Sequence, residues 1–327
     1  MVIPLTDTLV VKNITDENYF SSEYVQYISN SRLSLINPEQ GGSPEKYLAN
    51  EHKSSPSLSL GSAVHELILE PDDFRLVEGV DKPTAKLGMM ADYLFPYFMR
   101  NKTVTPEQVI EASDAIDYYK GKMNDAKIDN VLTSCWDYWS QRVLYEAKLG
   151  DYKNPIFLDA ASVQKCKGCV KSVQDNRSIQ ELLHPNDAIS MNETALFMDF
   201  LYKNDDKECT LKFKAKLDNF TIDTFTDAIV LNDLKTTGHY VDKFSESYEK
   251  YHYYRQVACY AYLLKLYAEK YHDIKEISSL QCNFLLVSTI PEFESSIFRV
   301  SEDDFTRGWE EFVKLMNMVG DVLTTKL

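Results

Sequence analysis

The chain has 327 residues, of which 44% are hydrophobic, and it holds only 11 glycines and 11 prolines. This composition excludes a disordered or fibrous chain and allows a substantial buried core. The formal net charge of −15 argues against a protein that coats nucleic acid over its whole surface, but it leaves room for one local basic channel.

Membrane and export signals are missing from the sequence. It has no run of about 18 apolar residues, and residues 1–7 lack a basic stretch followed by an apolar one. We therefore expect a soluble, intracellular protein with no membrane partner.

The six cysteines are scattered along the chain, which favours reduced thiols over a disulfide framework. Cys166 and Cys169 form the only close pair. A zinc or iron-sulfur site would need a second close Cys or His pair nearby, so we expect these two cysteines to be structural.

The first half of the sequence predicts mainly helices, over residues 31–36, 58–69, 105–119 and 159–182. Residues 58–69 carry apolar side chains at helical spacing. The helix from residue 105 begins with a threonine N-cap, a first-turn proline and a capping-box glutamine.

From about residue 193 the hydrophobic period changes to two, which predicts a β-hairpin over residues 194–200 and 210–218. The second strand alternates strictly, so one of its faces is apolar and the other is basic and ends in a carboxylate. The two faces are formed by Leu211, Phe213, Ala215 and Leu217, and by Lys212, Lys214, Lys216 and Asp218.

The remaining elements complete an α/β fold in which a mixed β-sheet is flanked by helices and the N-terminal half is helical. We expect one domain over residues 1–327: a helical part to about residue 190, a sheet-containing core over about 191–300, and a C-terminal helix over 301–327. The core is expected to contain strands over 220–225, 229–233, 280–288 and 295–300, and a tyrosine-rich helix over 249–271.

The most informative segment is Ile229–Thr237, where an apolar strand ends in an Asp-x-Lys pattern. Residues two apart on a strand share a face, so Asp233 and Lys235 point the same way while Leu234 turns into the core. Only this occurrence follows a strand that ends in another carboxylate; the others begin at Asp125, Asp151, Asp205 and Asp273.

This pattern suits metal-assisted hydrolysis of a phosphodiester. Magnesium prefers hard oxygen ligands, which Asp218, Asp233 and the backbone carbonyl of Leu234 would supply. Lys235 would orient the attacking water or stabilise charge. The ordinary alternative is a solvated strand end, with Asp218 paired to lysines of its own strand.

Several short motifs in this order resemble the PD-(D/E)XK superfamily, above all RecE-type exonucleases (exonuclease VIII) and their RecB-like relatives, over roughly residues 25 to 300. The core this implies is restriction-endonuclease-like. The motifs are Ile28–Leu33, Gly61–Pro71, Asn192–Thr194, Lys216–Asp218, Asp233–Thr237, and Gln256 with Tyr260.

The resemblance assigns roles to these residues. His65 is the helix-borne metal ligand, although a lone histidine on a helix is usually just accommodated. Gln256 and Tyr260 lie one turn apart on a helix, where they would hold the Asp233 strand, contact the phosphate backbone, or simply pack. By the same resemblance the carboxylate ligands are Asp218 and Asp233, and the catalytic lysine is Lys235.

Four expectations concern phosphate and one concerns metal. Ser31 and Arg32 open a helix, where backbone amides and a guanidinium can hold an anion, and the resemblance implies that this anion is a terminal 5'-phosphate. The alternative is N-capping by Ser31 with an exposed Arg32. Thr236 and Thr237 would contact DNA phosphates. Glu193 would reach the metal site from an adjacent strand.

The resemblance implies a Mg²⁺-dependent exonuclease, with Mn²⁺ able to substitute, that degrades linear double-stranded DNA from its 5' end and leaves 3' single strands for recombination. It also implies a ring-shaped homo-oligomer, a single-strand annealing partner, and the cytoplasm of a bacterial or phage-infected cell. Because the chain lacks the cysteine arrangement of the iron-sulfur members, we expect no cluster. The alternatives are an endonuclease or repair nuclease of the same superfamily acting on branched or single-stranded DNA, and an inactive DNA-binding or assembly module.

Overall fold

The computed structural model describes residues 1–327 except 13, 15, 51–55, 120, 148–153 and 326–327. The chain divides into two compact units. Unit 1 comprises Met1–Glu51, Val173–Ser288 and Glu294–Leu327, and unit 2 comprises His52–Ser172 and Thr289–Phe293. The sheet-containing unit therefore also takes in the first segment of the chain, which we had placed with the helical part. That both units act as one domain stays a prediction.

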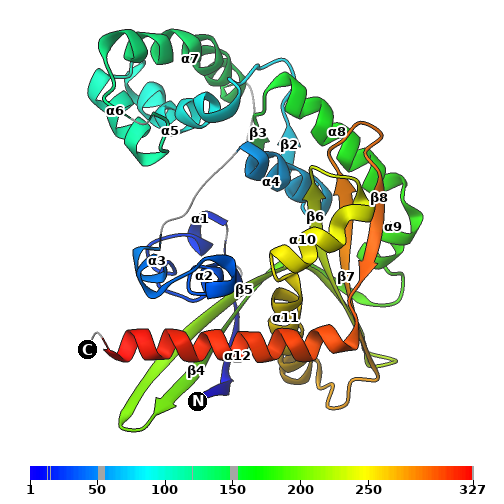
Figure 1. Ribbon diagram of the computed structural model, residues 1–327. Helices are drawn as coiled ribbons and strands as arrows, with labels where there is room; N and C mark the ends of the chain where they lie inside the picture. Colours follow the sequence, from blue (N-terminus) through cyan, green and yellow to red (C-terminus); the bar gives the residue numbers. More distant parts are fainter. Residues whose placement is uncertain (13, 15, 51–55, 120, 148–153, 326–327) are drawn as a thin grey trace. The chain divides into compact units, whose positions relative to one another are not determined.

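Unit 1 is built on a six-stranded mixed sheet in the order β1-β4-β5-β6-β7-β8 (Figure 1). Neighbouring strands are antiparallel except β6 and β7, which are parallel. The strands are β1 (Val2–Lys12), β4 (Ile189–Asn204), β5 (Lys207–Asp223), β6 (Ala228–Thr237), β7 (Ser279–Ser288) and β8 (Ser295–Arg299).

Helices flank this sheet, so the expected α/β class with a mixed central sheet is confirmed. Phe220 of β5 packs against Tyr267 of α11, and Phe200 and Phe213 of the hairpin pack against Phe312 of α12. The helices of unit 1 are α1 (Asp16–Tyr19), α2 (Asn30–Ser34), η1 (Pro38–Gln40), α3 (Pro44–Ala49), α9 (Arg177–Leu183), η2 (Val241–Lys243), α10 (Phe244–Lys250), α11 (Tyr253–His272) and α12 (Glu302–Thr325).

Unit 2 is helical, with one short parallel strand pair. Its core lies between α5 and α7, where Trp139 is buried against Phe98 and donates a 2.8 Å hydrogen bond to the carbonyl of Ala91. The elements are α4 (Pro56–Leu69), β2 (Phe74–Leu76), α5 (Ala85–Asn101), α6 (Pro106–Ala115), α7 (Asp125–Glu146) and β3 (Asn154–Ile156); α8 (Ala160–Asp175) runs from unit 2 into unit 1. Among the helices of the described residues, none is both long and apolar enough to span a bilayer.

Several element boundaries differ from the expected ones. The helix predicted over 159–182 is two helices, because Asn176 caps a new helix by accepting a hydrogen bond from the N–H of Ile179. The strand expected over 220–225 is the end of β5, and β6 continues to Thr237 because it pairs with β7 throughout. The helix predicted over 105–119 ends at Ala115.

The N-terminal strand β1 was not expected. It carries Pro4, which removes a donor and argues against a central strand, but among the described strands β1 lies at the edge of the sheet, beside β4. Its partner residues lie nearly 200 positions further along the chain, so no local pattern points to the pairing.

One buried ion-pair network fixes the start of α11. The Arg255 side chain is 0% exposed. It donates to Asn30 Oδ1 and Ser34 Oγ on α2, each at 2.8 Å, and to Glu311 Oε1 on α12 at 2.8 Å. His252 also contacts Glu311, at 2.8 Å through Nδ1. The network therefore holds α2, α11 and α12 together immediately beside Gln256.

Candidate active site

The candidate site lies where strands β5 and β6 part. Backbone pairing between these strands ends with Asn219 opposite Asn232. Beyond that pair, β6 continues beside β7, whereas β5 continues beside β4. Asp218 and Asp233 are the first residues beyond the last pair, so they lie on the two arms of a fork in the sheet.

Asp218 spans this fork. Its Oδ2 accepts a 2.8 Å hydrogen bond from the backbone N–H of Leu234. The side chain of Leu234 is itself buried in the core, as its place between Asp233 and Lys235 predicted. The carboxylate of one strand is thus tied to the main chain of the other.

Asp233 is 2% exposed, and Gln256 and Lys235 both contact its carboxylate. Gln256 of α11 donates a 2.6 Å hydrogen bond from Nε2 to Asp233 Oδ1. The ammonium of Lys235 forms an ion pair with Asp233 Oδ2. The strand geometry expected for Asp233 and Lys235 is therefore present, and Gln256 makes the contact to the Asp233 strand that the helix spacing suggested.

Lys235 is held as a cation. Burial by itself lowers the pKa of this ammonium, but the carboxylates of Asp233 and Asp218 outweigh burial and raise the pKa. A lysine that keeps its proton can donate hydrogen bonds to a water or a phosphate oxygen. In this arrangement Lys235 stabilises negative charge and does not take up a proton.

Glu193 lies on β4 at the level of Asp218, between the pairs Asn192–Asn219 and Thr194–Leu217. A carboxylate oxygen of Glu193 is within 4.8 Å of one of Asp218. Glu193 also forms an ion pair with Lys216, one of the lysines on the same strand as Asp218. The part of Lys216 was not foreseen, although it belongs to the Lys216–Asp218 motif.

The backbone of Glu193 is left-handed, with φ at 48° in the middle of a strand. A non-glycine residue in this region costs on the order of 1–2 kcal/mol. Such strained residues cluster at functional sites. The strain coincides with the one position on β4 where a carboxylate faces Asp218.

Tyr260 follows Gln256 by one turn of α11 and is half-buried. Burial raises the pKa of its phenol well above the ordinary value, and Tyr19, Asp233 and Asp218 add to the effect. The phenol is therefore neutral and lies in the field of both carboxylates. A neutral phenol can donate a hydrogen bond.

The contacts at Ser31 and Arg32 differ from the capping and the exposure considered for them above. Ser29, and not Ser31, caps α2 by accepting from the backbone N–H of Arg32 at 3.3 Å. The Arg32 guanidinium donates to the carbonyl of Val25 at 2.9 Å and lies 4.6 Å from the ring centre of Tyr47. The alternatives of capping by Ser31 and of a freely exposed Arg32 are both wrong.

Thr236 and Thr237 lie at the end of β6, and Thr237 Oγ1 accepts a 3.1 Å hydrogen bond from the N–H of His239. His65 is half-buried on α4 in unit 2, next to buried Ala63 and Val64. The roles expected of these residues toward DNA and metal stay predictions.

The Cys166 and Cys169 side chains are buried on α8. Burial raises the pKa of Cys166 to about 12 and that of Cys169 to about 11. Both are therefore protonated thiols at neutral pH.

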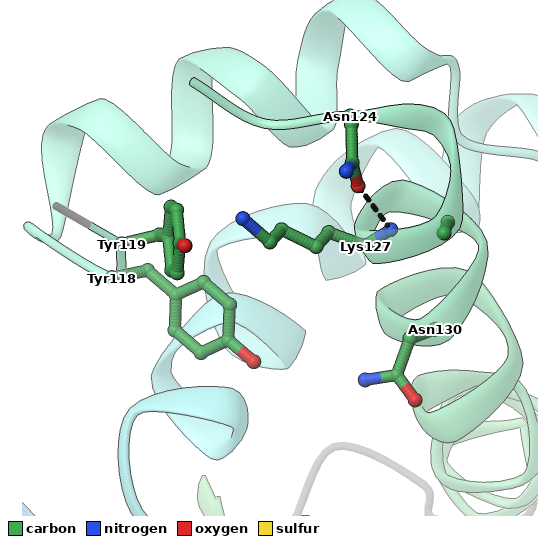
Figure 2. A pocket seen from close by; sticks show the side chains of 6 residues that line it. Tyr118, Tyr119, Asn124, Lys127 and Asn130 are labelled. Carbon is green, nitrogen blue, oxygen red and sulfur yellow. Dashed lines mark hydrogen bonds between the residues drawn. The ribbon is translucent and has the colours of Figure 1, made fainter. Parts of the chain in front are cut away.

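An open cleft of about 580 Å³ lies in unit 2, apart from the residues singled out above. Figure 2 shows the Lys127 side chain extending toward Tyr119, and its Nζ is 3.3 Å from the centre of that ring. Asn124 caps the helix by accepting from the N–H of Lys127 at 3.1 Å. The lining residues are Tyr118, Tyr119, Asn124, Ala126, Lys127 and Asn130.

The comparisons with known proteins are sparse. No family model matches the chain, and no curated protein matches it. Among solved structures, it is similar to a protein from Eubacterium rectale described as a "Putative exonuclease", with 14% identity and a TM-score of 0.46. The match covers 95% of this chain and 86% of that chain. A likeness this distant carries no information about activity.

Proposed function

We propose that this protein is a metal-dependent nuclease that hydrolyses DNA phosphodiester bonds. One observation carries the proposal: the carboxylates of Asp218 and Asp233 stand on the two arms of the fork, with the protonated Lys235 bound to Asp233. Carboxylates that bind a cation, beside an ammonium that neutralises charge on a phosphoryl group, are the groups that such hydrolysis needs.

The residues at the fork fit a divalent metal ion. Their donors are hard carboxylate oxygens, which Mg²⁺ and Mn²⁺ prefer, and those of Glu193 and Asp218 lie within 4.8 Å of each other. We propose Asp218, Asp233 and Glu193 as the carboxylate ligands, with the Leu234 carbonyl and the His65 imidazole as further ligands. When bound, the metal would activate water and stabilise the charge that develops on the phosphate.

The other side chains have positioning and charge-stabilising parts. Gln256 holds the Asp233 carboxylate in place by its 2.6 Å hydrogen bond. The ammonium of Lys235 donates to the attacking water or to a phosphate oxygen, and the neutral phenol of Tyr260 donates to a group bound at the fork. Thr236, Thr237, Ser31 and Arg32 are proposed as phosphate contacts.

The finer proposal is a Mg²⁺-dependent exonuclease that degrades linear duplex DNA from the 5' end and leaves 3' single strands for recombination. It is supported by the order of the motifs between Ile28 and Tyr260. On the same order of motifs we also propose a ring-shaped homo-oligomer, a single-strand annealing partner and a cytoplasmic location.

The test is cleavage of an end-labelled linear duplex with Mg²⁺, with Mn²⁺ and with a chelator. The protein should release nucleotides from the 5'-labelled end only when a metal is present, and Asp233→Ala should abolish release. Asp206→Ala, in the exposed turn between β4 and β5, is the matched control and should cleave like the wild type. Full activity of Asp233→Ala would place the site elsewhere.

Closed circular DNA separates the exonuclease from the endonuclease. An exonuclease spares covalently closed circles, whereas an endonuclease or branched-DNA nuclease opens them. If the folded wild-type protein neither binds Mn²⁺ nor cleaves any of these substrates, the alternative of an inactive DNA-binding module would remain.

A further inference from the structure

A row of four asparagines crosses the sheet at the closed end of the fork. Asn192 of β4 pairs with Asn219 of β5, Asn219 pairs with Asn232 of β6, and Asn232 pairs with Asn283 of β7. Asn219, Asn232 and Asn283 are at most 1% exposed. We call these four residues the asparagine row.

The side chains of the row form one directional chain of hydrogen bonds. Asn283 donates to Asn232 at 2.8 Å, Asn232 donates to Asn219 at 2.8 Å, and Asn219 donates to Asn192 at 2.7 Å. Asn232 also donates to the carbonyl of Leu182 on α9 at 3.3 Å. Buried amides that polarise one another in this way form a network whose members depend on each other.

The asparagine row and the carboxylates lie back to back. Successive side chains of an extended strand point to opposite faces, so Asn219 and Asn232 face away from Asp218 and Asp233 beside them in the chain. On the face of the asparagines, Asn232 donates to the Leu182 carbonyl of α9. On the opposite face, Asp233 accepts from Gln256 of α11.

The position of the row explains why polar residues are buried there. A buried amide contributes little net stability compared with a well-packed apolar side chain, but it fixes register, because a shift of one residue would leave it without a partner. Asn219 and Asn232 are the last backbone pair before β5 and β6 part. A change in the pairing of these two residues would therefore alter the distance between β5 and β6 at Asp218 and Asp233.

We propose that the asparagine row is a positioning device that sets the spacing of the metal-binding carboxylates at the fork; this inference rests on the proposed function. The row acts through the backbone: it fixes the Cα positions of residues 218 and 233, and the hydrogen bond from Leu234 to Asp218 then fixes one carboxylate across the gap. The asparagines themselves touch neither metal nor DNA.

The experiment compares Asn219→Ala, Asn232→Ala and Asn192→Ala with the wild type. Asn192 is exposed at the end of the row, so its loss removes one of the two acceptors of the Asn219 amide with little effect on folding; the other acceptor is Ser190 Oγ, at 3.1 Å. For each protein we would measure Mn²⁺ binding by electron paramagnetic resonance, the Mg²⁺ concentration for half-maximal cleavage, and thermal unfolding. For the variants, the Mn²⁺ concentration for half-saturation and the Mg²⁺ concentration for half-maximal cleavage should both rise about tenfold or more, as happens when a residue that supports a metal ligand is lost. Saturating Mg²⁺ should restore much of the cleavage rate.

Tyr138→Phe is the matched control. Tyr138 is also buried, at 2% exposure, but its hydroxyl donates to Asp92 at 2.8 Å in the core of unit 2. This variant should have a lower unfolding temperature but the same Mn²⁺ concentration for half-saturation and the same Mg²⁺ concentration for half-maximal cleavage as the wild type. If folded row variants bind Mn²⁺ and respond to Mg²⁺ like the wild type, within twofold, the inference is overturned. If the wild type neither binds Mn²⁺ nor cleaves DNA, the proposed function falls, and the inference falls with it.

Discussion

The Asp218 carboxylate accepts a 2.8 Å hydrogen bond from the backbone N–H of Leu234, across the gap where β5 and β6 have stopped pairing. A side chain thus takes over from the backbone ladder at the first position where the ladder fails. This contact gives Asp218 a structural part as well as its proposed chemical one.

Two substitutions separate these parts of Asp218. Asp218→Asn keeps an oxygen that accepts from Leu234 but removes the charge, whereas Asp218→Ala removes both. Cleavage of an end-labelled duplex should fall at least about 100-fold in each variant, because a ligand is lost. Urea unfolding should show a loss of about 1–3 kcal/mol for Asp218→Ala, whose Leu234 N–H has lost its acceptor, and a smaller loss for Asp218→Asn. Cleavage by Asp218→Asn at the wild-type rate would contradict a metal-binding carboxylate.

Lys235 should matter most for stability when no metal is bound. Lys235→Met leaves the buried Asp233 carboxylate without its cation, which should cost about 3–5 kcal/mol in a chelator. A bound divalent ion would replace that charge, so added Mg²⁺ should recover part of the loss in urea unfolding. Lys203→Met, which breaks an exposed ion pair with Glu208, should cost less than about 1 kcal/mol in either condition. An equal loss with and without Mg²⁺ would exclude a cation site beside Asp233.

The buried Arg255 should be needed to hold the start of α11. Arg255→Met leaves the Glu311 carboxylate and several buried acceptors without a donor, and we expect a loss of about 3–5 kcal/mol in urea unfolding. Arg307 is a suitable control, because it pairs with Glu249 at the surface and is 43% exposed. Arg307→Met should cost less than about 1 kcal/mol. Similar losses for the two arginines would mean that the buried network contributes no more than a surface pair.

The free energy of unfolding should depend on pH through Lys214. Burial lowers the pKa of its ammonium from 10.5 to about 8, with a further contribution from Arg32. Between pH 8 and 10.5 the unfolded chain therefore binds more protons than the folded chain, so this group makes stability rise with pH across that window. The wild type should gain up to about 3 kcal/mol relative to Lys214→Met between these values.

The control for Lys214 lies two residues away on the same strand. Lys212→Met removes an exposed lysine from that strand, so it shows how much of any change with pH comes from groups other than Lys214. Unfolding in urea at intervals from pH 7.5 to 10.5 measures both differences. A constant difference for Lys214→Met would show that Lys214 titrates normally in the folded protein.

Local periodicity predicted much of the sheet. The alternation from Leu211 to Leu217 predicted four side chains that are all buried, and the two-residue spacing placed Asp233 and Lys235 on one face. It also predicted a basic opposite face, but Lys214 on that face is buried, with its ammonium bound to the carbonyl of Tyr19. The residue that covers Lys214 lies almost 200 positions away, beyond the reach of any local pattern.

The fork could not be predicted for the same reason. The sequence shows two strands with carboxylates, but where their pairing stops depends on the register between them, and that register is fixed by partners on β4, β7 and α9. The asparagines beside Asp218 and Asp233 were visible as a signal: a polar residue at a core-facing strand position needs a buried partner. That these asparagines pair with one another becomes apparent only once the register of β4, β5, β6 and β7 is known.

The division of the chain has a consequence for synthesis on the ribosome. Strand β1 is made before the rest of the sheet, yet among the described strands it pairs with β4, which follows after most of unit 2 has emerged. The hairpin of β4 and β5 then keeps Phe200 and Phe213 exposed until α12 supplies Phe312. Domains usually fold in the order in which they are made, but here β1 and the hairpin have to wait for later segments. A nascent chain therefore carries its carboxylates without a finished core around them until α12 has emerged.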